Sequence, residues 1–118
     1  MLKIQSDHFR YDLRWIENLG AFGRDPQALI SNLLAVTRSD KPWTTEVLRG
    51  IRAPGTGWPF VIMLGTMRHR KGKDFCVVYR RNPVLMLEFK DERFKRWVIP
   101  DNQSNRDVLR QARPDLTF

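Results

Sequence analysis

Hydrophobic and polar positions alternate along several short stretches of the chain, which is the pattern of half-buried β-strands. The clearest runs from Phe9 to Trp15, where aromatic and leucine side chains alternate with charged ones. Similar runs bounded by turn residues predict strands at 27–30, 33–37, 60–67, 74–80, 84–89 and 97–99. About seven short strands at regular spacing favour a sandwich or a barrel.

Two stretches leave alternatives open. Residues 28–36 also fit a helical period, and Ser31 and Asn32 can start a single helical turn because both residue types cap helices well. Residues 47–51 fit either a short strand or an irregular edge.

Glycine and proline mark the connections between these strands. The run 53–57, Ala-Pro-Gly-Thr-Gly, predicts a turn, because proline presets φ and glycine tolerates positive φ. Gly65 lies inside a predicted strand, where glycine indicates a bulge or a close backbone approach. We expect residues 68–73 to form a hairpin loop with Gly72 as its left-handed residue.

The end of the chain predicts one amphipathic helix, over about 104–113. Asn102 or Ser104 can cap it, and Pro114 ends it. Val108, Leu109 and Ala112 form its apolar stripe, so packing against a sheet is expected to hold this short helix.

Composition indicates one globular domain over residues 1–118, with 42% hydrophobic and 29% charged residues. The start of the chain carries no apolar signal-peptide core, and no apolar run is long enough to span a bilayer. The single cysteine, Cys76, lies in an apolar run and is expected to be buried; one unpaired cysteine suits a reducing compartment. We therefore expect a cytoplasmic protein, with contact to a membrane surface as an alternative.

The net charge of +8 predicts attraction to nucleic acid, anionic lipid or acidic proteins, or else a solubilising surface that happens to be basic. The positive charge is densest in the predicted hairpin, and Arg80 and Arg81 close its return strand. If these side chains gather at one end of a two-stranded ribbon, they can bind phosphate or carboxylate groups. The candidate anion-binding or partner-binding residues are Arg68, His69, Arg70, Lys71, Lys73, Arg80 and Arg81. The alternative is a solvated loop tip.

Two further groups of residues are weaker candidates. Lys90, Arg93, Lys95 and Arg96 form a second basic cluster, in which Asp91 and Glu92 can make local ion pairs. The glycine-rich segment, residues 49–66, is interpreted as a structural turn motif. The alternative is an anion nest formed by the backbone N–H groups of Gly55, Thr56 and Gly57. That motif comprises Arg52, Pro54, Gly55, Thr56, Gly57, Trp58 and Gly65.

The tryptophans are expected mostly in the core. Trp43 and Trp58 lie in predicted connections and are the more exposed pair, and exposed aromatic side chains near cations suit base stacking or insertion at a membrane interface. Trp15 and Trp97 lie in predicted strands.

The residue inventory argues against catalysis. His8 and His69 are the only histidines, and with one cysteine they give no zinc-binding spacing. No Walker-type phosphate loop is present. We therefore predict no catalytic residues, no metal and no cofactor.

Motif residues add a family resemblance. Gly50, Arg52, Pro54, Gly55, Thr56 and Pro59 are followed by Leu64-Gly65-Thr66 and then by Gly72-Lys73-Asp74-Phe75. This arrangement resembles a group of mostly uncharacterised bacterial pleckstrin-homology-like proteins, over residues from about Leu29 to Ala112. The resemblance implies a barrel of seven antiparallel strands in two nearly orthogonal sheets, capped by the C-terminal helix. The first hairpin loop, 16–24, is nearly neutral, so the resemblance does not imply phosphoinositide binding.

Together these observations predict a mainly β, non-catalytic binding module. We expect a protein–protein interaction or scaffold domain, with anionic lipid binding through residues 68–73 or weak non-specific nucleic-acid binding as alternatives. Pairing of exposed edge strands could also give a homo-oligomer.

Overall fold

The structure is a computed structural model that describes residues 1–12, 25–44, 46–49, 51–58 and 62–118, and it does not describe the side chains of residues 51–58 and 62–64. The described part is mainly β, with one C-terminal helix, α1 (Gln103–Ala112). Its strands are β1 (Leu2–Gln5), β2 (His8–Tyr11), β3 (Gln27–Leu29), β4 (Leu33–Ser39), β5 (Ile51–Trp58), β6 (Ile62–His69), β7 (Gly72–Tyr79), β8 (Val84–Phe89) and β9 (Arg96–Pro100). A single 3-10 turn, η2 (Ile30–Asn32), joins β3 to β4.

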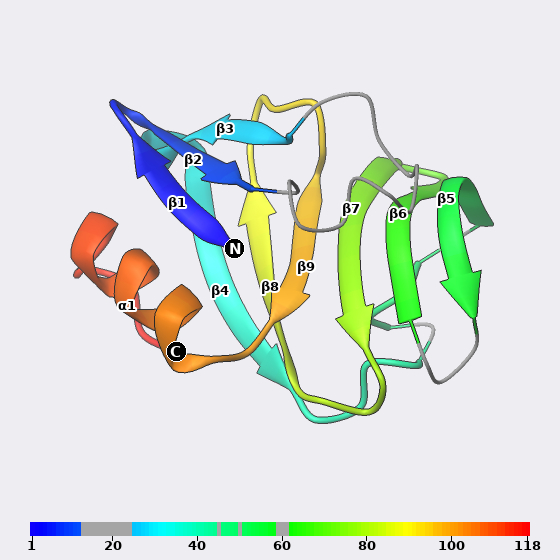
Figure 1. Cartoon of the computed structure of the whole chain (residues 1–118). Coiled ribbons are helices and arrows are strands. Elements are labelled where there is room, and N and C mark those ends of the chain that lie inside the picture. Colours follow the sequence, from blue (N-terminus) through cyan, green and yellow to red (C-terminus); the bar gives the residue numbers. More distant parts are fainter. Residues whose placement is uncertain (13–24, 45, 50, 59–61) are drawn as a thin grey trace.

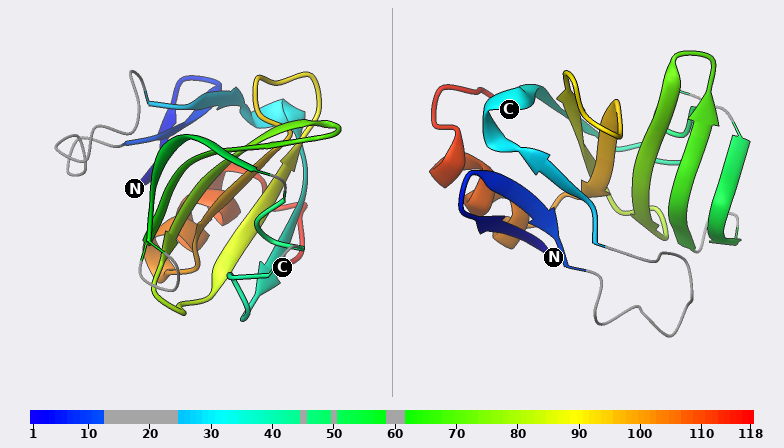
Figure 2. Two further views of the ribbon diagram at one scale, coloured as in Figure 1. Left: turned by 90° about the vertical axis from the view of Figure 1, so that its right-hand side faces the viewer. Right: turned by 90° about the horizontal axis from the view of Figure 1, so that it is seen from above.

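The strands form two sheets, which Figure 1 shows from one side. The small sheet has the antiparallel order β1-β2-β3, and the large sheet has the order β4-β8-β9-β7-β6-β5. All neighbours in the large sheet are antiparallel except β7 and β9, which are parallel. The small sheet and α1 lie on the same side of the large sheet (Figure 2).

Alternating side chains divide the large sheet into two buried faces. On the face covered by the small sheet and α1, the ring of Phe75 lies 5.5 Å from that of Tyr11 and 5.8 Å from that of Trp97, measured between centroids. Leu109 is the fully buried residue of the helical stripe, and Val108 and Ala112 pack beside it. The opposite face contains Cys76, Val78 and Val98, against which Trp43, Val47 and Leu48 pack. Burial on both faces confirms the predicted core positions of Trp97 and Cys76.

Several local predictions are confirmed. Residues 33–39 form a strand, so the helical alternative for 28–36 is wrong, although η2 supplies the single turn expected at Ser31 and Asn32. Gly72 has a positive φ of 142°, directly after the two-residue turn Arg70–Lys71. The helix begins at Gln103 and is capped by Asn102, whose side chain accepts from the backbone N–H of Asn105; Ser104 lies inside the helix.

The predicted turn over residues 53–57 is wrong. These residues belong to β5, which pairs with β6 from Ile51 to Trp58. The pairing register shifts between Arg52 and Gly55 of β5, which pair with Met67 and Gly65 of β6. The extra residue of the bulge therefore lies in β5, whereas the sequence analysis expected a bulge or a close backbone approach at Gly65 in β6. Proline is tolerated because β5 is an edge strand of the sheet, where a missing backbone donor costs little. A glycine- and proline-rich segment therefore marks a bulged edge strand here.

The predicted barrel is also not found. In the part of the chain that the structure describes there are nine strands, and the edge strands β4 and β5 do not pair with each other. The sequence prediction missed β1. Of its two alternatives for residues 47–51, the irregular one fits residues 46–48, which are turns and bends, while residue 50 lies outside the described part and Ile51 begins β5. The predicted strand from Phe9 extends beyond Tyr11 into residues outside the described part, as do the loop 16–24 and Trp15.

Asn105 joins the helix to both sheets. Its side-chain N–H group donates to the carbonyl oxygen of Pro100 in β9 (2.8 Å), and its side-chain oxygen accepts from the backbone N–H of Leu2 in β1 (3.2 Å). The residue is 1% exposed, so both of these polar contacts lie away from water. A buried amide that satisfies two backbone groups fixes the position of α1 on the small sheet.

We expect Asn105→Ala to lower the free energy of unfolding by about 1–3 kcal/mol, because it leaves buried backbone groups of Leu2 and Pro100 without their partner. Urea unfolding followed by circular dichroism measures this loss. The control is Gln111→Ala, an exposed change on the same helix. Equal stability of the two variants would contradict the proposed role of Asn105.

Candidate functional site: the basic end of the large sheet

Two connections meet at one end of the large sheet, the upper end in Figure 1. Because β7 and β9 are parallel neighbours, the β6–β7 turn at Arg70–Lys71 lies beside the β8–β9 loop over residues 90–95. The backbone N–H of Lys95 donates to the carbonyl oxygen of Lys73 (2.8 Å), which ties the loop to the hairpin. The Cγ atom of Lys95 also packs over Gly72, where an added Cβ would lie 3.0 Å from it.

This pairing unites the two basic clusters predicted from the sequence. We define the basic end by the cations that the two connections carry. They are Arg68, Arg70, Lys71, Lys73, Lys90, Arg93 and Lys95. All are exposed except Lys73, which is half-buried. The two connections together carry seven cations and only two carboxylates, Asp91 and Glu92, so this end of the sheet has a strong positive charge.

The ring of Phe94 organises the centre of the basic end. The Nζ atom of Lys73 lies 5.4 Å from its ring centroid, and the Cζ atom of Arg93 lies 5.2 Å from it. Both distances suit cation–π contacts. Burial, followed by the charges of Arg93 and Arg68, lowers the pKa of Lys73. The neighbouring positive charges therefore act on one another, as expected for one continuous cationic surface.

The carboxylate of Glu92 has hydrogen-bond partners outside the basic end. Its carboxylate accepts from the backbone N–H of Leu29 (3.0 Å) and from the side chain of Asn32 (2.6 Å). These contacts join the β8–β9 loop to η2 and to the small sheet. The carboxylate thus anchors the loop that presents the cations.

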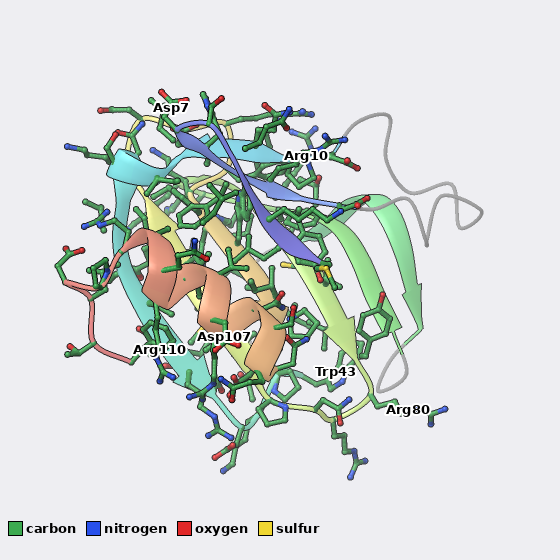
Figure 3. The ribbon with its side chains drawn as sticks, turned by 60° about the vertical axis from the view of Figure 1, so that its left-hand side comes forward. Asp7, Arg10, Trp43, Arg80, Asp107 and Arg110 are labelled. Carbon is green, nitrogen blue, oxygen red and sulfur yellow. The ribbon has the colours of Figure 1, made fainter. Side chains whose placement is uncertain are left out.

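Arg80 and Arg81 do not belong to the basic end, contrary to the prediction. They follow β7 at its opposite end, and an eight-residue strand separates the two ends by roughly 25 Å. Figure 3 shows Arg80 beside Trp43, at the end of the molecule away from Asp7. The indole N–H of Trp43 donates to the carbonyl oxygen of Arg80 (2.5 Å), and its ring packs on the core, so Trp43 is only half-exposed.

His69 is likewise not available to a partner. Its side chain is 9% exposed; Nε2 lies 3.0 Å from a carboxylate oxygen of Asp74, and Nδ1 accepts from the backbone N–H of Lys71 (3.3 Å). Both ring nitrogens therefore have hydrogen-bond partners within the chain, and the ring shapes the hairpin.

A buried charge network supports the basic end from beneath. Asp74 is fully buried and accepts two hydrogen bonds from the guanidinium of Arg49, at 2.8 and 2.7 Å. The buried Arg96 lies 3.5 Å from the same carboxylate. Arg96 also donates to the carbonyl oxygens of Glu46 and Val47, at 3.1 and 2.6 Å. The network therefore fixes the segment 46–49 against the large sheet.

The pKa directions agree with this geometry. Hydrogen bonding to Asp74 raises the pKa of Arg49, whereas burial and then the charge of Arg49 lower the pKa of Arg96. The buried Nε atom of Arg96 has no hydrogen-bond partner among the described residues. Arg96 is thus a structural cation with a large desolvation cost, and the sequence prediction that placed it in a surface cluster is wrong.

Among the described residues, no three histidine, cysteine, aspartate or glutamate side chains lie together as a metal site would require. Burial raises the pKa of the Cys76 thiol, so it is held as a thiol in the core. No helix in the described ranges is long and apolar enough to cross a membrane.

The predicted anion nest over Gly55 to Gly57 is wrong, because these residues are extended in β5 and pair with β6, whereas a nest needs a turn conformation. The side chains of Arg52 to Trp58 lie outside the described part of the structure. Comparison with protein-family models, curated proteins and solved structures finds no match to this chain.

We expect Asp74→Asn to lower the free energy of unfolding by about 3–5 kcal/mol, because it leaves the buried guanidinium of Arg96 without a compensating charge. Urea unfolding provides the measurement. Asp91→Asn is the matched control on the exposed loop and should change stability by no more than about 0.5 kcal/mol. A loss below about 1 kcal/mol for Asp74→Asn would show that the network is not needed for stability.

Proposed function

We propose that this chain is a non-catalytic binding module that docks an acidic surface of a protein partner through its basic end. The observation that carries the proposal is the gathering of seven cations from two connections at one end of the large sheet. Charge of one sign, concentrated on a small surface, speeds and orients association with an oppositely charged partner.

The way these cations are held favours the carboxylates of a protein over a fluid lipid surface. Lys73 and Arg93 pack on the ring of Phe94, and the backbone contact between Lys95 and Lys73 fixes the two connections relative to each other. A fixed pattern of cations suits a fixed pattern of carboxylates, because less side-chain entropy is lost when the contacts form.

Lipid and nucleic-acid surfaces are less well served by the same residues. Phe94 is 4% exposed, and the large exposed apolar side chains of the described residues, Met1, Ile4 and Leu34, lie outside both connections. Insertion into a membrane interface or stacking on bases uses exposed aromatic or apolar side chains. The basic end therefore offers these ligands charge alone.

The pleckstrin-homology-like family and the cytoplasmic location remain predictions from the sequence. The parallel pair β7–β9 and the six-stranded sheet depart from two all-antiparallel sheets. We therefore base the proposed function on the basic end and not on the resemblance.

The test removes three exposed charges from the basic end, in the triple variant Arg70→Ser, Lys71→Ser and Lys95→Ser. We expect binding to a polyglutamate peptide at low salt to weaken about a hundredfold, since each cation near an anionic surface contributes on the order of 1 kcal/mol. Fluorescence anisotropy of the labelled peptide measures the affinity. Raising the salt should weaken wild-type binding in the same direction.

The matched control removes three charges from the opposite end, as Lys41→Ser, Arg80→Ser and Arg81→Ser. It has the same net charge as the first variant and should retain binding within about threefold of wild type. Equal losses in both variants would show that net charge, and not the basic end, determines binding. Tighter binding to phosphatidylserine vesicles or to duplex DNA than to polyglutamate would replace the protein partner with lipid or nucleic acid.

A further inference from the structure

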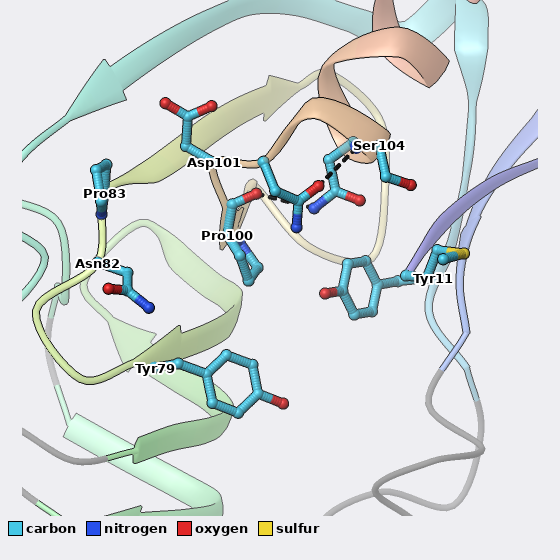
Figure 4. Close-up of a pocket in the computed structure, with 10 residues that line it drawn as sticks. Tyr11, Tyr79, Asn82, Pro83, Pro100, Asp101 and Ser104 are labelled. Carbon is cyan, nitrogen blue, oxygen red and sulfur yellow. Dashed lines mark hydrogen bonds between the residues drawn. The ribbon is translucent and has the colours of Figure 1, made fainter.

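The charged side chains of the described residues differ in how far their charge is compensated. Asp101 lines a cleft of about 610 Å³ where β9 passes into α1, which Figure 4 shows in close-up. Its carboxylate accepts from Arg38 at 2.6 Å and also binds Arg106, so its charge is fully compensated. Lys73 at the basic end differs, because within the described part of the chain its ammonium group forms no ion pair with a carboxylate.

Two arginines lie near Lys73 in place of an acid. Arg68 of β6 is the residue directly opposite Lys73 of β7, so the two side chains leave the hairpin on the same face. Arg93 comes from the β8–β9 loop, and its Cζ atom shares the ring of Phe94 with the Nζ atom of Lys73, at 5.2 and 5.4 Å from the ring centroid. Like charges held this close repel one another. The fold thus keeps the amine of Lys73 beside two other cations.

The ring of Phe94 fixes Lys73 in this environment. Phe94 is 4% exposed, and its ring lies 5.8 Å from that of Phe75 in the core, measured between centroids. Lys73 is half-buried, so part of its side chain stays in contact with solvent. Burial, and then the charges of Arg93 and Arg68, lower the pKa of Lys73, which raises the share of free amine at neutral pH. The free amine is the nucleophilic form of lysine.

We propose that Lys73 is a modification site, at which an acyl phosphate transfers its acyl group to the side-chain amine. The Nζ atom attacks the carbonyl carbon of the donor, and a C–N bond forms. The C–O bond to the phosphate breaks, and inorganic phosphate leaves with the bonding electron pair and with the proton that the nitrogen releases. The products are an amide on Lys73 and free phosphate.

The neighbouring arginines explain why the donor is an acyl phosphate. The guanidinium groups of Arg68 and Arg93 suit phosphate oxygens, and positive charge at this end raises the local concentration of an anionic donor. Fixed cations also stabilise the negative charge that grows on the departing phosphate. The two arginines thus act on the donor, and Lys73 acts as the acceptor.

Acylation changes the charge of the basic end. The amide nitrogen carries no charge, so Lys73 loses its cation–π contact with Phe94 and the basic end loses one of its cations. Weaker binding of an acidic partner after acylation rests on the proposed function, whereas the acylation itself does not. The rate of acylation and the affinity for polyglutamate are separate measurements, so failure of one proposal is distinguishable from failure of the other.

The experiment incubates the full chain with acetyl phosphate at neutral pH and measures acetylation at each lysine by mass spectrometry. We expect Lys73 to be acetylated about tenfold faster than Lys41, an exposed lysine at the opposite end of the large sheet. Lys71 and Lys95, the exposed lysines beside it, should also react more slowly than Lys73. Equal rates at Lys73 and Lys41, or a faster reaction at Lys71 or Lys95, would overturn the proposal.

Two variants of equal net charge test the role of the neighbouring cations. Arg93→Gln should slow the acetylation of Lys73 about fivefold or more, because it removes one cation from the shared ring of Phe94. Arg80→Gln, an exposed change at the opposite end, should leave that rate within about twofold of wild type. Equal rates at Lys73 in the two variants would show that the neighbouring cations do not promote the reaction.

A donor without phosphate tests the class of reagent. With p-nitrophenyl acetate, a neutral ester, the effect of Arg93→Gln on Lys73 should be smaller than with acetyl phosphate, because no phosphate is left to bind. An effect of equal size with both donors would overturn the assignment of an acyl phosphate as the donor.

Discussion

The carboxylate of Asp74 is a buried charge at the centre of the large sheet, and the placement of the surrounding segments depends on its neutralisation. Arg49 reaches it from the segment after β4, His69 from β6 and Arg96 from β9. A buried ion pair adds little net stability compared with apolar packing, but its loss is costly because the remaining charge has no solvent. The network therefore specifies one arrangement: β7 beside β9 in parallel register, with the segment 46–49 closing the second face of the sheet.

This arrangement also determines where the surface chemistry lies. Parallel neighbours place the β6–β7 turn and the β8–β9 loop at the same end, so two modest basic clusters become one. The same topology sends Arg80 and Arg81 to the other end, where Arg80 lies beside Trp43. The strand β7 thus separates the basic end from a second group of cations at the opposite end of the sheet.

Local features were predictable from the sequence, whereas features formed by distant segments were not. The β6–β7 hairpin follows from alternation and from Gly72, and the helix follows from Asn102 and its apolar stripe. The strand β1, Leu-Lys-Ile-Gln, does alternate, but it is only four residues long and of its two apolar residues only Leu2 is buried. The segment around Pro54 has the composition of a turn, although bulged edge strands tolerate that composition equally well. The parallel pair and the Asp74 network each depend on contacts between remote segments. One signal for the network was present, namely a single aspartate directly before the apolar run Phe75 to Val78.

Cys76 gives the large sheet a built-in chemical reporter. It is 0% exposed, it lies on β7 between β6 and β9, and its sulfur is the only thiol of the chain. A thiol reagent can reach that sulfur only when the strands around it separate or when Trp43, Val47 and Leu48 move away from it. The rate at which a thiol reagent modifies Cys76 under native conditions therefore measures how often this part of the sheet opens. The free energy of local opening follows from that rate, without any introduced label.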